Sequence, residues 1–360
     1  MLRRNLHPAA WWLWALALAV AASRTTNPVL LGLIIAVVAF VVVNRRGDAP
    51  WALAFRLYAY IGLFIVVLRV LFRILIGGED GGHVLFHLPE LPLPEIAGGV
   101  TLLGPASAEE LLGGFYDGLR LATMVLCVGA ANALANPKRL LKAVPGALYE
   151  VGTAVTVALS VAPQLAESVL RVRRARRLRA GRQRGLRALK GIIVPVLEDA
   201  MDRSLMLASA MDSRGYGRRG YLPRSVRIVV GVCVLTGLTG VCAGIYGVLD
   251  GTSTWLGTPL LVGGLVVSVA GFLLGGRRVR RTSYRPDPWR WPETAVAASG
   301  IGAVALLVAT AKIDAANLYP SLNPLRWPEV SPWHAGALLL GVLPAWLAPL
   351  PQLTGAGVRA

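Results

Sequence analysis

The residues best able to do chemistry in this sequence are arginines, concentrated between residues 171 and 219. This stretch begins RVRRARRLRAGRQRGLRALKG and ends AMDSRGYGRRG. A guanidinium group is planar, stays charged at physiological pH and donates paired hydrogen bonds to carboxylates or phosphates. The stretch therefore predicts a surface that binds acidic groups of another protein or the headgroups of anionic lipids.

Motifs for catalysis are missing from the sequence. There is no GxxxxGK[ST] phosphate-binding loop, no HExxH zinc motif and no GxSxG nucleophile motif. Cys127, Cys233 and Cys242 lie in apolar runs without a CxxC pair, so neither a disulfide nor a zinc site is expected. We therefore expect a chain that is not an enzyme and has no catalytic residues, cofactor or metal of its own.

The composition places these arginines in a membrane protein. The chain has 360 residues, of which 55% are hydrophobic and 16% charged, and its mean hydropathy is +0.59. Its net charge is +18, and residues 136–227, with 19 Lys/Arg and 6 Asp/Glu, carry +13 of it. Basic residues between apolar segments belong in the cytoplasm by the positive-inside rule. Membrane topology thus explains the charge, and no nucleic-acid partner is expected.

Eight apolar segments predict about eight transmembrane helices in an all-α, polytopic protein of the plasma (inner) membrane. The first is residues 1–23, which also resemble a signal peptide but carry three tryptophans suited to a retained span. The others are residues 28–43, 51–76, 111–132, 226–248, 255–274, 294–311 and 333–350. Basic loops follow the second, fourth and sixth spans, so both termini are expected in the cytoplasm.

The same pattern predicts three regions along the chain. Residues 1–135 form an N-terminal transmembrane region with an outer loop at 77–108, and residues 226–360 form a C-terminal transmembrane region. Residues 136–225 form a cytoplasmic, inner-face region between them. Within it, residues 145–169 are mostly apolar but have basic flanks on both sides. That segment should therefore lie along the inner membrane face.

The outer loop contains the only cluster of residues that suggests a metal. His83 and His87 lie near three acidic residues, Glu79, Asp80 and Glu90. No tight ligand spacing accompanies them, so solvated loop histidines are the simpler interpretation. The prolines of this loop favour extended backbone, and Gly98-Gly99 could turn a hairpin.

Two helices are predicted in the basic region. Residues 161–179 carry apolar positions at helical spacing, and residues 192–213 form a second helix with small residues at spacing four: Ala200, Ser204 and Ala208. Such a row permits a close helix crossing. Gly215 suits the position after the second helix, so Arg214 should project from its end. A solvated basic helix end is the alternative for the arginines near 179.

Several segments together resemble the transmembrane T component of energy-coupling-factor (ECF) transporters, the EcfT/CbiQ family. They are AMDSRGYG, ARRLRAG, SVAPQLAESV, HPAAWWLW, GLRLATMVL and NPKRLLKAVP. The resemblance covers the N-terminal two-thirds of the chain. YRPDPWRWPE and the two spans after it look like an added C-terminal portion.

The resemblance implies two Xaa-Arg-Xaa motifs whose arginines enter grooves on ATP-binding-cassette ATPases. Ser213-Arg214-Gly215 matches the second motif. Leu178-Arg179-Ala180 is the first, but it departs from the usual Ala-Arg-Gly at both flanking positions, which leaves its register open by a few residues.

The implied function is that of a scaffold in an ABC importer for vitamins or transition metals such as cobalt or nickel. Its partners would be two ATPase subunits, or a fused pair, which bind ATP, and a membrane S component, which binds the substrate. Anionic lipids would contact the basic region. The alternatives are a membrane enzyme acting on a lipid phosphate and a lipid-binding structural membrane protein.

Overall fold

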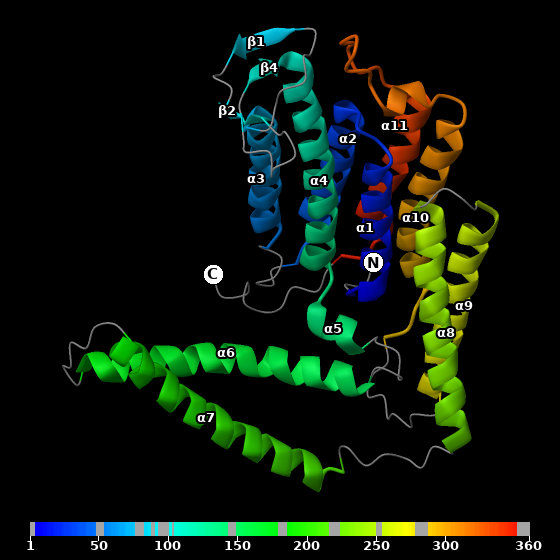
Figure 1. The fold of residues 1–360 in the computed structure, drawn as a ribbon. Helices are drawn as coiled ribbons and strands as arrows, with labels where there is room; N and C mark the ends of the chain where they lie inside the picture. Colours follow the sequence, from blue (N-terminus) through cyan, green and yellow to red (C-terminus); the bar gives the residue numbers. More distant parts are fainter. Residues whose placement is uncertain are drawn as a thin grey trace. The chain divides into compact units, whose positions relative to one another are not determined.

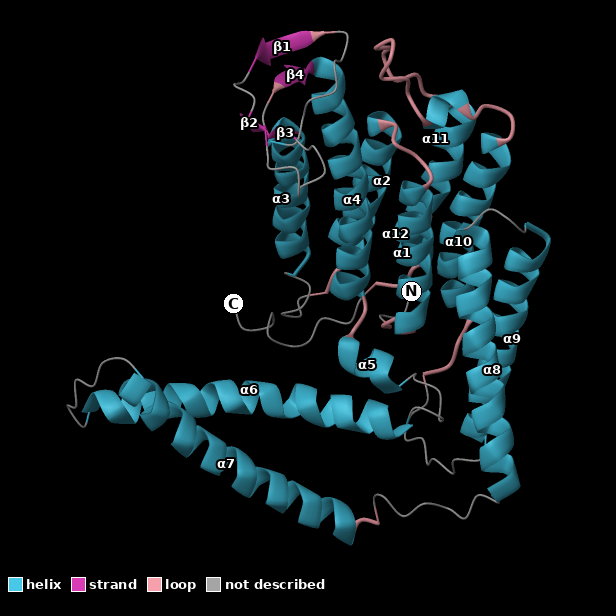
Figure 2. Cartoon of the chain, viewed as in Figure 1, coloured by secondary structure: helices cyan, strands magenta, loops and turns pink. Residues whose placement is uncertain are grey.

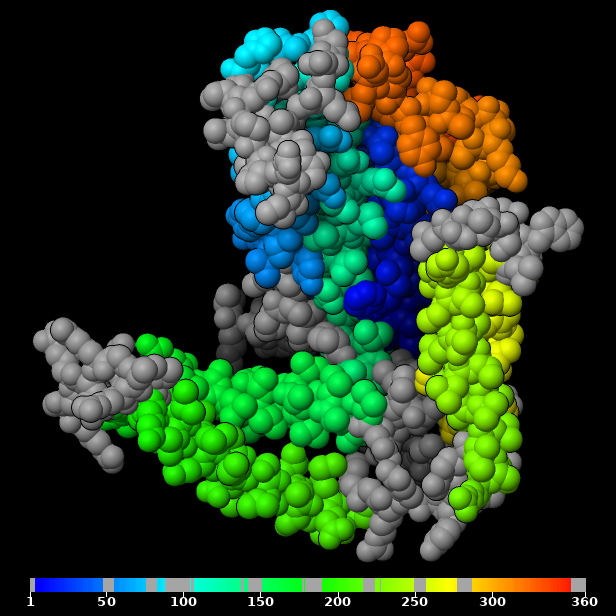
Figure 3. All heavy atoms as spheres, in the orientation of Figure 1, coloured from blue at the N-terminus to red at the C-terminus, as the bar shows by residue number. Residues whose placement is uncertain are grey.

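The computed structural model describes a helical protein with two small antiparallel sheets (Figures 1 and 2). It describes residues 4–47, 54–75, 83–87, 91–92, 101–102, 104–142, 149–178, 186–215, 224–249, 254–277 and 287–350; the others are grey in Figure 3. The chain divides into two compact units. Unit 1 is Met1–Leu140 with Pro286–Ala360, and unit 2 is Leu141–Arg285. The predicted all-α class is confirmed.

Unit 1 contains most of the short elements and five long helices. Its helices are α1 (Pro8–Ser23), α2 (Pro28–Arg45), α3 (Ala54–Leu75), α4 (Ala108–Leu134), α10 (Trp291–Ala311), the 3-10 turns Ala316–Leu318 and Leu340–Val342, α11 (Pro332–Leu339) and α12 (Pro344–Leu347). The short helix α5 (Pro137–Lys142) begins in unit 1 and ends just past its boundary.

Local sequence starts several of these helices. Pro28 stands in the first turn of α2, where its missing N–H costs nothing, and the Asn27 side chain accepts a hydrogen bond from the Val29 N–H. The Ser107 hydroxyl accepts from the Glu110 N–H at the start of α4. These caps satisfy backbone donors that the first helical turn leaves free.

The core of unit 1 lies among α1, α2, α4, α10 and α11. Its largest fully buried side chains include Trp14, Leu18, Leu31 and Leu307. The Trp14 indole donates to the carbonyl of Gly341 over 3.0 Å, so this buried donor is satisfied. Gly300 allows α10 close to α1, because a Cβ there would lie 2.8 Å from the Cα of Trp14. Small residues thus set the helix spacing.

The first and last expected spans differ from a full transmembrane helix. The first, α1, has 16 residues and is about 24 Å long, which is shorter than a hydrocarbon core of about 30 Å. The last, expected at 333–350, is a helical run at Pro332–Leu347 made of α11, a 3-10 turn and α12, and it too is shorter than a full span. Pro344 has no N–H to donate, so the preceding turn lacks one helical hydrogen bond, and the run tightens to a 3-10 turn there.

The added C-terminal portion is an integral part of unit 1. The helix α10 packs against α1, and α11 packs against both α10 and α2. Asn27 joins the two ends of the chain, since its side-chain amide donates to the carbonyls of Asn317 and Glu329. Residues 287–350 therefore complete the core around α1 and α2.

The outer loop carries the two small sheets. The strands β1 (Val84–His87) and β4 (Pro105–Ser107) pair antiparallel, as do β2 (Leu91–Pro92) and β3 (Thr101–Leu102). The pairing of β2 with β3 agrees with the extended hairpin expected from the prolines. Gly98 and Gly99 themselves lie outside the described residues.

Unit 2 consists of long helices. They are α6 (Tyr149–Leu178), α7 (Leu186–Ser213), α8 (Arg224–Leu249) and α9 (Thr254–Arg277). Both α6 and α7 begin earlier than the sequence predicted, at 149 rather than 161 and at 186 rather than 192. Pro163 and Pro195 lie inside them without ending them.

Seven helices in the described part of the chain are long and apolar enough to cross a membrane: α2, α3, α4, α6, α8, α9 and α10. Six of these correspond to predicted spans, and the seventh is α6. The expectation that α6 lies along the inner face, like the three-region division of the chain, stays a prediction.

Candidate functional site

The helices α6 and α7 cross at a polar contact. Ser168, one of the few buried residues of unit 2, donates its hydroxyl hydrogen bond to Asp199 Oδ2 over 2.7 Å. Arg203 Nε donates to Asp199 Oδ1 over 3.1 Å, and Arg203 Nη1 donates to Gln164 Oε1 over 3.1 Å. Asp199 is therefore the centre of a network that joins the two helices.

The carboxylate of Asp199 is stabilised in its charged form. The hydrogen bond from Ser168, followed by that from Arg203, lowers the pKa of Asp199 below its ordinary value of 3.8. This carboxylate therefore holds the crossing together at neutral pH.

The sequence pointed to half of this network. Asp199 and Arg203 are visible as an i,i+4 pair, but Gln164 and Ser168 were not assigned a role. Their signal is two polar residues at spacing four inside the mostly apolar run 161–170, which also contains Glu167. Nearer the C-terminal end of α6, Arg176 lies against α7, because a Cβ on Gly191 would come within 2.5 Å of its guanidinium.

The small-residue row of α7 is not part of the described crossing contacts. Ala200 is half-buried, whereas Ser204 and Ala208 are exposed. The Ser204 hydroxyl donates back to the carbonyl of Met201. The role of the row as a crossing surface stays a prediction, and its exposure leaves it available to a partner.

The end of α7 has the geometry that Gly215 predicts. Gly215 has a φ of 73°, a left-handed conformation that residues with a Cβ rarely adopt. The Arg214 N–H donates to the Met211 carbonyl over 3.2 Å, and the Gly215 N–H donates to the Asp212 carbonyl over 2.9 Å. These bonds close the last turn and fix where Arg214 leaves the helix.

The side chain of Arg214 is exposed, and within the described residues its guanidinium makes no ion pair or hydrogen bond. A cation is favoured there because the partial negative charge of the helix dipole lies at the C-terminus. The Ser213 hydroxyl is used locally, since it donates to the Ala210 carbonyl. Arg214 therefore presents five N–H donors to an acidic partner.

The first motif lies at the opposite end of the hairpin and is described in part. Leu178, the last residue of α6, is 86% exposed. Arg179 and Ala180 lie outside the described residues. An exposed leucine at this helix end is available for contact with a partner, as is the apolar row Met201, Leu205 and Met206 of α7.

The outer-loop histidines do not form a metal centre with the residues that the structure describes. His83 Nδ1 lies 2.8 Å from Glu109 Oε1, and the His83 N–H donates to Glu109 Oε2 over 3.3 Å. This pair ties β1 to the start of α4. Within the described ranges no three His, Cys, Asp or Glu side chains gather to hold a metal ion.

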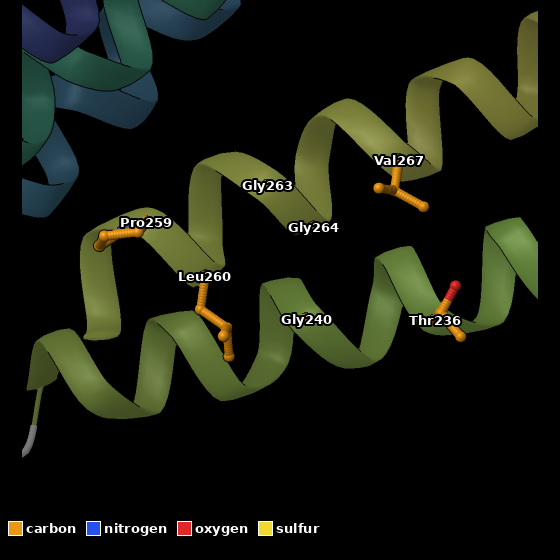
Figure 4. A pocket seen from close by; sticks show the side chains of 7 residues that line it. All are labelled: Thr236, Gly240, Pro259, Leu260, Gly263, Gly264 and Val267. Carbon is orange, nitrogen blue, oxygen red and sulfur yellow. The ribbon is translucent and has the colours of Figure 1, made fainter. Parts of the chain in front are cut away.

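An open groove lies between α8 and α9 (Figure 4). It is lined by Thr236, Gly240, Pro259, Leu260, Gly263, Gly264 and Val267. The one hydroxyl in this lining, that of Thr236, already donates to the Val232 carbonyl over 2.7 Å. The groove is therefore apolar in character and suited to contact with lipid chains.

The long apolar helices and the basic hairpin define a multi-pass α-helical membrane protein. The sequence profile of the CbiQ family, described as cobalt transport protein, matches residues 2–222. The chain therefore belongs to the CbiQ family of transport proteins, the family of ECF transporter T components. The match includes α6, α7 and Arg214, and it ends before α8. No curated protein matches the sequence.

Proposed function

We propose that this protein is the T component of an ECF-type ABC importer, the membrane scaffold that couples cytosolic ATPases to a substrate-binding S component. The observation that carries the proposal is Arg214, an exposed arginine held at the end of α7 by a left-handed glycine. Arg214 is also the residue that the sequence resemblance assigns to the second Xaa-Arg-Xaa motif, and it lies within the region that the family profile matches.

Arg214 would bind one of the two ATPases, or one half of a fused pair. A guanidinium in a groove makes bidentate bonds to a carboxylate, and each charged hydrogen bond contributes about 1.5–3 kcal/mol. Leu178-Arg179-Ala180 would bind the second ATPase in the same way. ATP is bound by these partners, so the chain itself is a non-catalytic subunit.

In the proposed importer, α6 and α7 would transmit the movement of the ATPases to the S component. The network around Asp199 joins the helices near their crossing, so a displacement at Arg214 is passed to α6. The small-residue row, with Ala200 half-buried and Ser204 and Ala208 exposed, would offer close contacts to an S component, and the exposed Met206 would offer an apolar one.

The location follows from charge. Residues 136–227 carry most of the net positive charge, and the positive-inside rule puts them in the cytoplasm. The helix α6, with basic residues on both flanks, would lie along the inner face of the plasma membrane and contact anionic lipids. The cargo would be a vitamin or a transition-metal ion such as cobalt or nickel, chosen by the S component.

Co-purification tests the proposal. The full chain is purified in a mild detergent from its native cells, and the ATPases retained with it are quantified by mass spectrometry. Arg214→Ala should lower their retention at least tenfold, since a loss of about 1.4 kcal/mol changes an equilibrium tenfold. Arg224→Ala removes another exposed arginine, at the start of α8, and should retain the wild-type amount.

Gly215→Ala tests the geometry of the site and not its charge. A Cβ in the left-handed conformation costs about 1–2 kcal/mol, so the helix end should rearrange and displace Arg214. Retention should fall although every charge remains. Full ATPase retention by the folded double variant Arg179→Ala and Arg214→Ala would sink the coupling assignment.

A further inference from the structure

The start of the C-terminal portion docks onto the N-terminus of the chain. The fully buried Glu293 accepts hydrogen bonds from the Arg4 guanidinium, from the His7 N–H over 3.4 Å and from the Arg290 N–H over 3.1 Å. The rings of His7 and Trp289 lie 5.4 Å apart. Residues 287–293 therefore hold the segment that leads into α1.

The same segment also holds α5. Arg139 Nε lies 2.9 Å from Asp287 Oδ2, and Arg139 Nη2 donates to the carbonyl of Asn5 over 3.3 Å. The side chains of Arg139 and Asp287 are 21% and 38% exposed, so water screens the pair only in part. One arginine thus joins three stretches of unit 1: the N-terminus, α5 and the start of the C-terminal portion.

The Arg139–Asp287 pair lies where the chain leaves unit 1 and returns to it. Unit 2 is an insertion in unit 1, and the chain passes between the units at two points, after residue 140 and after residue 285. Arg139 stands just before the first point and Asp287 just after the second. The ion pair therefore joins a residue just before the insertion to a residue just after it.

We propose that the Arg139–Asp287 ion pair, called the pin below, holds both chain connections to unit 2 together at one point of unit 1. Without it, α5 is a six-residue helix, too short to be stable alone. With it, the chain segments that lead into and out of unit 2 are held together, and the buried Glu293 joins them to the N-terminus.

The proposal rests on contacts within unit 1 and stands apart from the proposed function. In the proposed transporter, the two chain segments that lead to unit 2 would start from one fixed point of unit 1. Arg139 and Asp287 are then positioning residues.

Hydrogen exchange of the full chain in lipid nanodiscs tests the pin. Two segments are followed, residues 137–142 and residues 287–293. Arg139→Gln should raise exchange at least fivefold in residues 287–293, and Asp287→Asn should do so in residues 137–142. The effect is thus expected across the pair, in the segment that carries no substitution. The double variant should exchange no faster than the faster single variant, because both single variants break the same ion pair.

Matched controls remove the same charges elsewhere in unit 1. Arg326→Gln and Glu329→Gln alter exposed residues that form no ion pair within the described chain, and both segments should exchange as in wild type. The exchanged pair Arg139→Asp with Asp287→Arg should regain at least half of the lost protection. Because the pair is partly exposed, each variant is expected to fold.

Three outcomes of the hydrogen-exchange experiment would contradict the pin. Faster exchange confined to the substituted segment, independent effects that multiply in the double variant, or no rescue by the exchanged pair would each overturn the pin. ATPase retention gives the distinction from the proposed function. Arg139→Gln should retain the ATPases that Arg214→Ala loses, so the failure of one proposal leaves the other to be judged by its own measurement.

Discussion

The two units of this protein bury different kinds of side chain. In unit 1 the fully buried residues include many large apolar side chains, among them Trp14, Leu18, Leu31 and Ile34. In unit 2 the buried residues of the described helices are all glycine or serine: Ser168, Gly237, Gly244, Gly257, Gly264, Ser268 and Gly271. Unit 1 is held by an interior, whereas unit 2 is held by helix pairs whose backbones touch.

The difference has a physical consequence for each unit. An interdigitated interior of large side chains resists deformation, because every displacement opens a cavity. A helix pair with small residues at its seam leaves its large side chains on the outside, as Leu235, Tyr246 and Val266 are. Such surfaces need lipid or a partner, which suits unit 2 for contact and unit 1 for support.

The largest expected effect on stability comes from a substitution in the interior of unit 1. Leu31→Ala should lower the free energy of unfolding by about 2–5 kcal/mol, because it removes a fully buried side chain and leaves a cavity. Leu63→Ala, at a position 62% exposed on α3, should cost far less. Unfolding with sodium dodecyl sulfate in mixed micelles measures both. Equal losses for the two variants would mean that unit 1 has no distinct interior.

An intermediate effect is expected at the seam of α8 and α9. A Cβ on Gly264 would lie 2.5 Å from the backbone nitrogen of Val241, so Gly264→Ala should force the helices apart and cost about 1–3 kcal/mol. Gly263 is its neighbour, and a Cβ there meets open space. Gly263→Ala should therefore stabilise the helix by about 0.5–1 kcal/mol. Thermal unfolding in detergent compares the two, and the reverse order would contradict the seam.

The smallest effect concerns the polar crossing of α6 and α7. The pKa of Asp199 is lowered, so its stabilising contribution is complete at neutral pH and is lost as pH falls through that lowered value, below about 4. The difference in melting temperature between wild type and Asp199→Asn should be constant above about pH 5 and shrink in more acidic solution. If the difference in melting temperature instead grew on acidification, the stabilising role of the charged Asp199 carboxylate would be contradicted.

Much of the fold follows from local sequence. Apolar runs of sufficient length predict six of the seven long apolar helices, and Gly215 predicts the left-handed end of α7. Polar residues with prolines predict the extended outer loop. Each of these features depends on residues that are close together in the chain, so a single sequence contains the needed information.

The contacts between helices do not follow in the same way. The pairing of Asp199 with Ser168 joins residues 31 positions apart, and that of Arg139 with Asp287 joins residues 148 positions apart. Which polar residues meet depends on how each helix is rotated and which neighbour it approaches. The 3-10 turn inside the last helical run was not predicted either, although Pro344 was visible, because hydropathy alone ignores the missing N–H.

The sequence by itself determined that this is a helical membrane protein with a basic region between its apolar helices and an arginine at the end of a long helix. Hydropathy and charge act residue by residue, and so they are readable along the chain. Tertiary structure decided that the C-terminal portion completes the core around α1 and α2, and that Asp287 meets Arg139 beside the insertion. Those facts arise from packing between distant segments, whose energy depends on shape in three dimensions.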